Sequence, residues 1–135
     1  MAVLARSAAT LRISGDDLNP QELSKLLGAT PTLACVKGEP RRPGGKVIAR
    51  TGQWHLSAKD TETADIDAQV AEILMQLPAD LDVWRSLATH YQIDLFCGWF
   101  MNESNEGVEI AAETLSALGS RGIKLDVDLY APTVE

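Results

Sequence analysis

Apolar and polar residues alternate along several short stretches of the chain, which is typical of strands that bury one face. Leu11–Ser14 is the first such stretch, and in the last one Leu125, Val127 and Leu129 are expected to point inward. A Thr-Gly pair at 51–52 separates two stretches and predicts a tight hairpin. The expected strands cover residues 11–14, 32–36, 46–50, 53–57, 92–100 and 124–130.

Apolar residues that recur every three or four positions predict helices in four other segments. The first helix has Asn19 at its N-cap, Pro20 in its first turn and Gly28 at its end, and these residue types favour those places. Pro78 ends the second helix, and Gly119 is expected to close the fourth. The expected helices cover residues 20–27, 66–77, 81–91 and 110–118.

These elements predict a single α+β domain over residues 10–131, between an N-terminal segment (1–9) and a C-terminal tail (132–135). A mixed or mainly antiparallel sheet with helices packed on one face fits their order. The hairpin at 46–57 breaks the strict alternation of a parallel Rossmann-like fold. A strand, a helix and a strand follow one another near each end. The domain therefore either contains duplicated units or has two similar capped helices by chance.

Composition and charge narrow the functional classes. The 135 residues are 45% hydrophobic and 23% charged, and a domain of this length buries roughly two-thirds of its unfolded surface. The net charge of −7 argues against nucleic acid as a partner, because phosphate binding needs a basic footprint. The charge fits a basic protein partner, and it equally fits an acidic protein whose charge serves only solubility.

The chain shows no sign of secretion or membrane insertion. Cys35 and Cys97 are too few for a secreted disulfide framework, so free thiols in a reducing compartment are expected. Arg6 interrupts the apolar N-terminus before it reaches the length of a signal-peptide core. No stretch has the roughly 20 apolar residues that a membrane span needs. We therefore expect a cytoplasmic protein.

Residues that commonly carry catalysis or bind metals are sparse. Gly44-Gly45-Lys46 ends like a phosphate-binding loop, but Pro40 stands where its first glycine is needed and no hydroxyl follows the lysine. His55 and His90 have no cysteine or histidine at a short ligand spacing. Cys97 falls on the apolar side of its strand, as buried inert thiols do. The sequence predicts no catalytic residue, metal site or cofactor.

Charged residues occupy outward positions on several expected strands. Asp126 and Asp128 share one side of the last strand, about 7 Å apart. Asp94 and Arg12 lie on the polar sides of their strands, and His55 lies opposite its apolar neighbours. A sheet with helices on one face and water on the other would collect these residues on its outer face. This face is either solvated, or a recognition surface for a cationic partner, or the site of catalytic carboxylates.

Residues 37–46 form a loop rich in glycine, proline and basic side chains. Arg41, Arg42 and Lys46 are the candidates to contact a carboxylate-rich or phosphate-bearing ligand. A mobile, exposed hairpin loop has the same composition. The three tryptophans fall on apolar faces, which predicts core packing; they are Trp54, Trp84 and Trp99.

Taken in order, these features resemble a bacterial family of domains of unknown function, the family numbered 4279. The similarity covers about residues 9–131. The similar parts are Leu11–Ser14 with Asp17, Leu26-Leu27-Gly28 with Pro31, Gly38, Trp54, the central helix pair, Leu115 with Leu118-Gly119, and Leu125–Tyr130. A Ser or Thr commonly opens the last helix in such sequences, whereas Ile110-Ala111-Ala112 has no capping side chain. The resemblance implies a small bacterial α+β domain without an established enzymatic activity.

Two functions fit these observations. The first is a non-catalytic protein-binding module, immunity-like by analogy with small families that act beside secreted toxins. It would use an acidic sheet face made of Arg12, Asp94, Asp126 and Asp128. The alternative is a small-molecule-binding or enzymatic domain that uses Asp94, Asp126, Asp128 and His55. A broad surface rimmed by charge would favour the first, and a concave pocket the second.

Overall fold

A computed structural model describes residues 2–133 of the chain. Within these residues no helix is both long and apolar enough to cross a membrane. The elements are β1 (Ala2–Val3), β2 (Arg6–Gly15), α1 (Pro20–Leu27), β3 (Leu33–Cys35), β4 (Gly52–Ser57), β5 (Thr61–Glu62), α2 (Ile66–Leu74), α3 (Leu81–His90), β6 (Gln92–Phe100), β7 (Glu106–Gly107), α4 (Ala112–Ser120) and β8 (Lys124–Tyr130).

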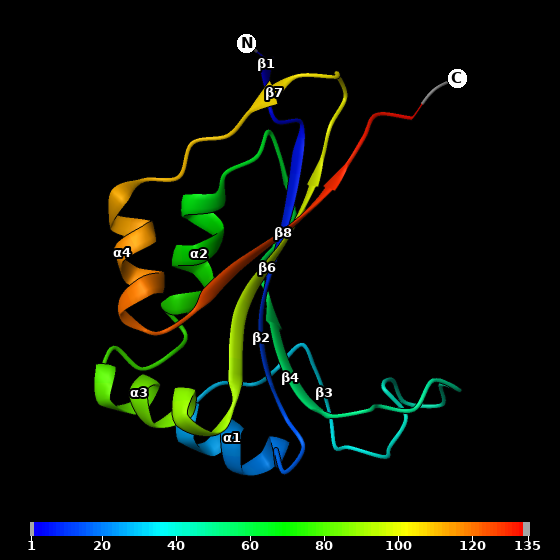
Figure 1. Cartoon of the computed structure of the whole chain (residues 1–135), viewed down its shortest axis with the longest axis vertical. Coiled ribbons are helices and arrows are strands. Elements are labelled where there is room, and N and C mark those ends of the chain that lie inside the picture. Colours follow the sequence, from blue (N-terminus) through cyan, green and yellow to red (C-terminus); the bar gives the residue numbers. More distant parts are fainter. Residues whose placement is uncertain (1, 134–135) are drawn as a thin grey trace.

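One sheet organises the domain, with its strands in the order β3-β4-β2-β6-β8 and with β5 paired to the start of β2. The β6–β8 pair is parallel and the other pairs of this sheet are antiparallel. The four helices cover one face, and the segment between β3 and β4 lies on the other (Figure 1). The predicted architecture, a mixed sheet with helices on one face, is therefore confirmed.

The core lies between the helices and the inner face of the sheet. Trp54 and Trp84 are fully buried in it, and Trp99 packs against it while partly buried. The two fully buried indoles each make a hydrogen bond, whereas Trp99 Nε1 has no partner within residues 2–133. Trp54 Nε1 donates to Ser24 Oγ at 3.0 Å, and Trp84 Nε1 donates to the Pro78 oxygen at 2.9 Å. The alternation in β2 and β4 places the core residues on one face because successive strand side chains point to opposite sides.

The structure corrects several boundaries predicted from the sequence. The first strand is predicted over residues 11–14, whereas β2 runs from Arg6 to Gly15. Residues 46–50 do not form a strand of the sheet. They fold back on residues 38–41 instead, through an isolated bridge between Pro40 and Ile48 and backbone hydrogen bonds such as Arg41 N to Val47 O. The predicted tight hairpin at 51–52 is therefore wrong.

The last helix and strand also differ from expectation. Gly119 lies inside α4, and the positive φ of 70° that follows the helix belongs to Gly122. Leu129 is 63% exposed, although its position in the alternation predicts an inward side chain. It lies near the end of an edge strand, and its neighbour Tyr130 is exposed as well.

Helix α4 lacks a capping side chain of its own, as the sequence predicted, and α2 supplies one. Asp67 Oδ1 accepts hydrogen bonds from the backbone N–H of Ala111 at 3.0 Å and from Thr114 Oγ1 at 2.7 Å. This carboxylate also places a negative charge at the N-terminal end of α4, where the helix dipole favours it. The capping contact therefore ties α2 to α4.

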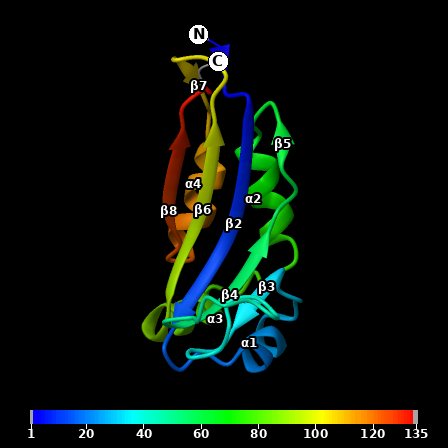
Figure 2. The same cartoon turned by 90° about the vertical axis from the view of Figure 1, so that its right-hand side faces the viewer.

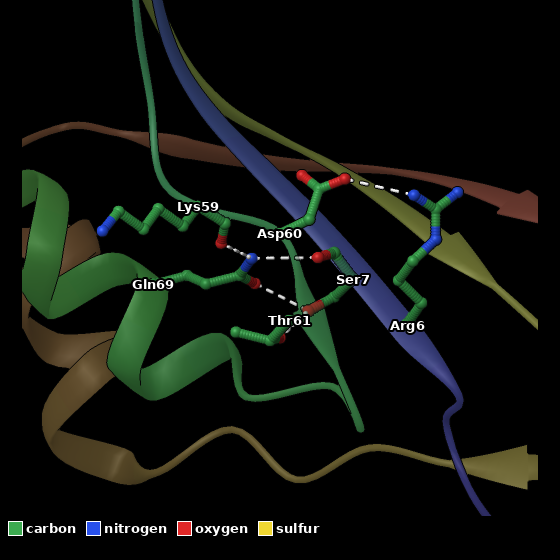
Figure 3. Close-up of polar contacts among 6 residues, drawn as sticks. All are labelled: Arg6, Ser7, Lys59, Asp60, Thr61 and Gln69. Carbon is green, nitrogen blue, oxygen red and sulfur yellow. Dashed lines mark hydrogen bonds and ion pairs between the residues drawn. The ribbon is translucent and has the colours of Figure 1, made fainter.

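A buried polar cluster joins α2 to β2 and to the chain before β5 (Figure 3). Gln69 Nε2 donates to the backbone oxygens of Ser7 and Lys59, both at 2.9 Å. Ser7 Oγ donates to Gln69 Oε1 at 2.7 Å, and Thr61 Oγ1 lies 3.1 Å from Ser7 Oγ. Because the Ser7 proton is directed to Gln69, Thr61 is the donor in the second contact. Hydrogen bonds thus satisfy a side chain that the core would otherwise exclude.

Candidate functional site

The strand register brings Arg12 and its predicted neighbours together on the outer face of the sheet. Arg12 lies opposite His55 on β4 and opposite Asp94 on β6, while Asp126 on β8 lies opposite Phe96. Figure 2 shows the outer face of these strands with the helices behind them. Of the residues predicted to share this face, Arg12, Asp94, Asp126 and His55 are adjacent, and Asp128 lies further along β8.

Arg12 and Asp94 form a bidentate ion pair. Arg12 Nε lies 2.7 Å from Asp94 Oδ1, and Nη2 lies 2.8 Å from Oδ2. The hydrogen bond with Asp94 raises the pKa of Arg12 above its ordinary value. Arg12 Nη2 also contacts Asp126 Oδ2 at 3.3 Å, and its guanidinium lies 4.4 Å from the centre of the Phe96 ring. Fork-shaped pairs of this kind fix both side chains more tightly than a single contact does.

Because of this pairing, the carboxylates of the predicted acidic cluster differ in how far they are free to bind a partner. The Asp94 side chain is 20% exposed and bound at both oxygens, so it has little capacity left for a partner. Asp126 is 52% exposed and shares one oxygen with Arg12. Asp128 makes no ion pair within residues 2–133. It lies beside Tyr130, and its hydrogen bond with the Tyr130 hydroxyl raises the pKa of Tyr130. The carboxylates still open to solvent are therefore the two on β8.

An aromatic ladder, formed by Arg6, Phe100 and Tyr130, crosses the far end of the same face. The Arg6 guanidinium lies 3.8 Å from the centre of the Phe100 ring, and the Phe100 and Tyr130 rings stack at 4.6 Å. Both rings lean over Gly98, where an added Cβ would lie 3.4 Å from Phe100. The sequence interpretation missed this ladder. The sequence feature that could have indicated it is the presence of two aromatic residues, Phe96 and Phe100, at outward positions of a strand whose outer face was expected to contact water.

The basic loop covers the other end of the outer face (Figure 2). Arg41, Arg42 and Lys46, the three predicted contact residues of the loop, are all exposed, and of these only Arg41 lines a cavity there. Lys37 pairs with Asp16 at 3.1 Å. The structure therefore brings only one of the three predicted loop residues to the Arg12 region.

This cavity has a volume of about 170 Å³. Burial, followed by the charges of Arg12 and Arg41, lowers the pKa of His55 at its wall. Gln53 Oε1 is buried there without a hydrogen-bond partner within residues 2–133. The lining residues are Arg12, Ser14, Arg41, Thr51, Gln53, His55 and Asp94. The cavity thus joins Asp94 and His55, as the small-molecule alternative requires, without Asp126 or Asp128.

The two cysteine thiols, those of Cys35 and Cys97, are buried. Cys97 is fully buried, and burial raises its pKa to about 11, so it is protonated at neutral pH. Cys35 is buried and unpaired as well. The predicted core position of Cys97 is confirmed by its burial, and its lack of reactivity stays a prediction.

Comparisons with known proteins agree with the resemblance found in the sequence. Residues 5–132 match the family described as "Domain of unknown function (DUF4279)". The comparisons with curated proteins and with solved structures found no match. Because the family match spans nearly the whole chain, this protein belongs to the DUF4279 family.

Proposed function

We propose that this protein is a non-catalytic protein-binding module whose edge strand β8 takes a basic, extended segment of a partner. The observation that carries the proposal is the position of Asp126 and Asp128. Both project from the outer face of an edge strand and remain open to solvent.

Strand β8 suits the addition of another strand. It is seven residues long and pairs only with β6 within the described part of the chain. An extended peptide can add to such an edge through main-chain hydrogen bonds, and its alternate side chains then give specificity. On the outer face those side chains would lie beside Asp126, Asp128 and the Tyr130 ring.

The chemistry of these residues selects a cationic partner. Carboxylates attract Lys and Arg, and an aromatic face adds a cation–π contact. The net charge of −7 supports the same choice, because it speeds encounter with a basic protein. In its narrowest form, the proposal is that the partner is a basic toxin and that this domain neutralises it.

Site-specific crosslinking tests the proposal. The photoreactive residue p-benzoylphenylalanine is placed at Leu129, which is 63% exposed on β8, or at Met75, which is 84% exposed at the end of α2. In lysate of the source organism, the Leu129 position should crosslink a basic protein that the Met75 position does not. Equal products from both positions would refute the proposal.

A charge-matched pair of variants completes the test. Asp126→Asn/Asp128→Asn should weaken capture of the crosslinked protein, and added salt should weaken wild-type capture in the same way. Glu39→Gln/Glu103→Gln removes the same charge from exposed positions elsewhere and should leave capture unchanged. Equal loss in both variants would show that only net charge matters and would contradict recognition at β8.

A further inference from the structure

The cavity under the basic loop is chemically unlike the rest of the outer face. At about 170 Å³ it holds the volume of about five or six water molecules, at roughly 30 Å³ each. This is well below the 300–1,000 Å³ typical of drug-sized ligands. The residues that line it all have polar or charged side chains, and they include Asp94 as well as Arg12 and Arg41. The cavity therefore suits a small polar ligand.

We propose that this cavity binds a small oxyanion that carries its own O–H group, of the hydrogen phosphate kind. Arg41, with the N–H of His55 and the hydroxyl of Ser14, would bind the anionic oxygens. Gln53 Oε1 would accept the hydrogen bond from the ligand's O–H. The proposal does not depend on a protein partner at β8.

The charges at the cavity favour an anion. Arg12 is already paired with Asp94 and contacts Asp126. Arg41 makes no ion pair within residues 2–133, so its positive charge is not balanced locally. The pKa of His55 is lowered, so at neutral pH its imidazole is uncharged and has one N–H to donate. An oxyanion in the cavity would balance the charge of Arg41, which is itself exposed.

The amide of Gln53 decides which kind of oxyanion fits. Its Oε1 is buried without a donor among the described residues, where Trp99 Nε1 and Arg121 Nε are also buried without a partner. Of these three atoms, only Gln53 Oε1 belongs to a residue that lines the cavity. Sulfate has no proton to give at neutral pH, whereas hydrogen phosphate and its monoprotonated relatives do. The unpaired acceptor therefore predicts that phosphate binds more tightly than sulfate of similar size.

Calorimetric titration of the full chain with inorganic phosphate, at constant ionic strength and neutral pH, tests the proposal. We expect saturable binding of one phosphate, with sulfate weaker by about tenfold, the value of one such hydrogen bond. Glycolate, a hydroxy-carboxylate, tests whether a carboxylate can supply the anionic oxygens instead. Phosphate binding that is tighter than glycolate binding supports the proposal, whereas glycolate binding that is tighter than phosphate binding would overturn it.

Two loop variants make the result specific. Arg41→Gln should weaken phosphate binding by about tenfold or more, because a charged hydrogen bond is lost. Arg42→Gln removes the same charge from the adjacent exposed residue and should leave binding unchanged. Both sites lie in an exposed loop, so the fold is retained. No saturable binding, sulfate as tight as phosphate, or equal loss in both variants would overturn the proposal. Asp126→Asn/Asp128→Asn should bind phosphate normally, which separates this site from β8.

Discussion

Gln69 offers the sharpest test of what holds the helical layer to the sheet. The residue is 1% exposed and makes three hydrogen bonds that join α2 to β2 and to Lys59. Gln69→Met keeps nearly the same length and volume but removes all three bonds. The Ser7 and Lys59 oxygens then lose a donor inside the core, which is the costly way to break a hydrogen bond.

The expected loss is ~3 kcal/mol of unfolding free energy, at ~1 kcal/mol for each bond. For 135 residues this corresponds to a fall in Tm of ~10 °C. Urea unfolding followed by tryptophan fluorescence measures it directly, because Trp54 and Trp84 are buried in the native core. Gln76→Met is the matched control. The Gln76 side chain is exposed and makes one surface bond to the Glu72 oxygen, so the change should stay within ~0.5 kcal/mol.

A double-mutant cycle with Ser7→Ala identifies the cause. Ser7 Oγ donates to Gln69 Oε1 at 2.7 Å, so the double variant should lose less stability than the sum of the two single variants. A loss below ~1 kcal/mol for Gln69→Met, or strict additivity with Ser7→Ala, would refute the reasoning. Either result would mean that water or a shifted side chain replaces the bonds at little cost.

Three further predictions concern glycine, histidine and cysteine positions. Gly52→Ala should lose about 2 kcal/mol, because its Cβ would lie 2.8 Å from the Gly15 oxygen. Gly119→Ala meets nothing within 4 Å inside α4 and should gain roughly 0.5–1 kcal/mol. The opposite ranking in urea unfolding would contradict both. Burial lowers the pKa of His55 from 6.5, so the unfolded state binds the proton more readily and stability should fall as the pH drops below 6.5. His55→Gln should flatten this dependence in urea unfolding at about pH 7.5 and about pH 5.5, and parallel curves would exclude His55 as its source. The pKa of Cys97 is raised by burial to about 11. Iodoacetamide at about pH 8 should therefore label it only as fast as the native protein opens, and labelling at the rate of an exposed thiol would contradict this.

Much of the local structure is predictable from neighbouring residues alone. Helix α1 begins where Asn19 Oδ1 accepts the N–H of Glu22 and ends where Gly28 takes a φ of 65°. Both signals lie within a few residues of the backbone groups that they satisfy. The face of each strand is predictable for the same reason, since alternation fixes which side chains share a side. Arg12, Asp94 and Asp126 were therefore assigned correctly to outward positions.

Elements that depend on distant contacts were misjudged. Residues 46–50 have the composition of a strand, but the sheet does not pair with them and they bond to residues 38–41. Gly119 resembles a helix end, yet α4 continues past it to Ser120. The helix start at Ala111 depends on Asp67, 44 residues earlier. Local propensity is a weak prior that tertiary contacts override.

The α+β class, the capped first helix and the outward direction of the charged strand residues all follow from local sequence patterns. The bidentate pair of Arg12 with Asp94, 82 residues away, and the cavity that Arg41 and His55 share without Asp128 follow only from the three-dimensional arrangement. Strand register accounts for this difference. Alternation tells which face a side chain occupies, but which residues lie opposite one another depends on how whole strands pair, and that is settled by packing across the entire domain.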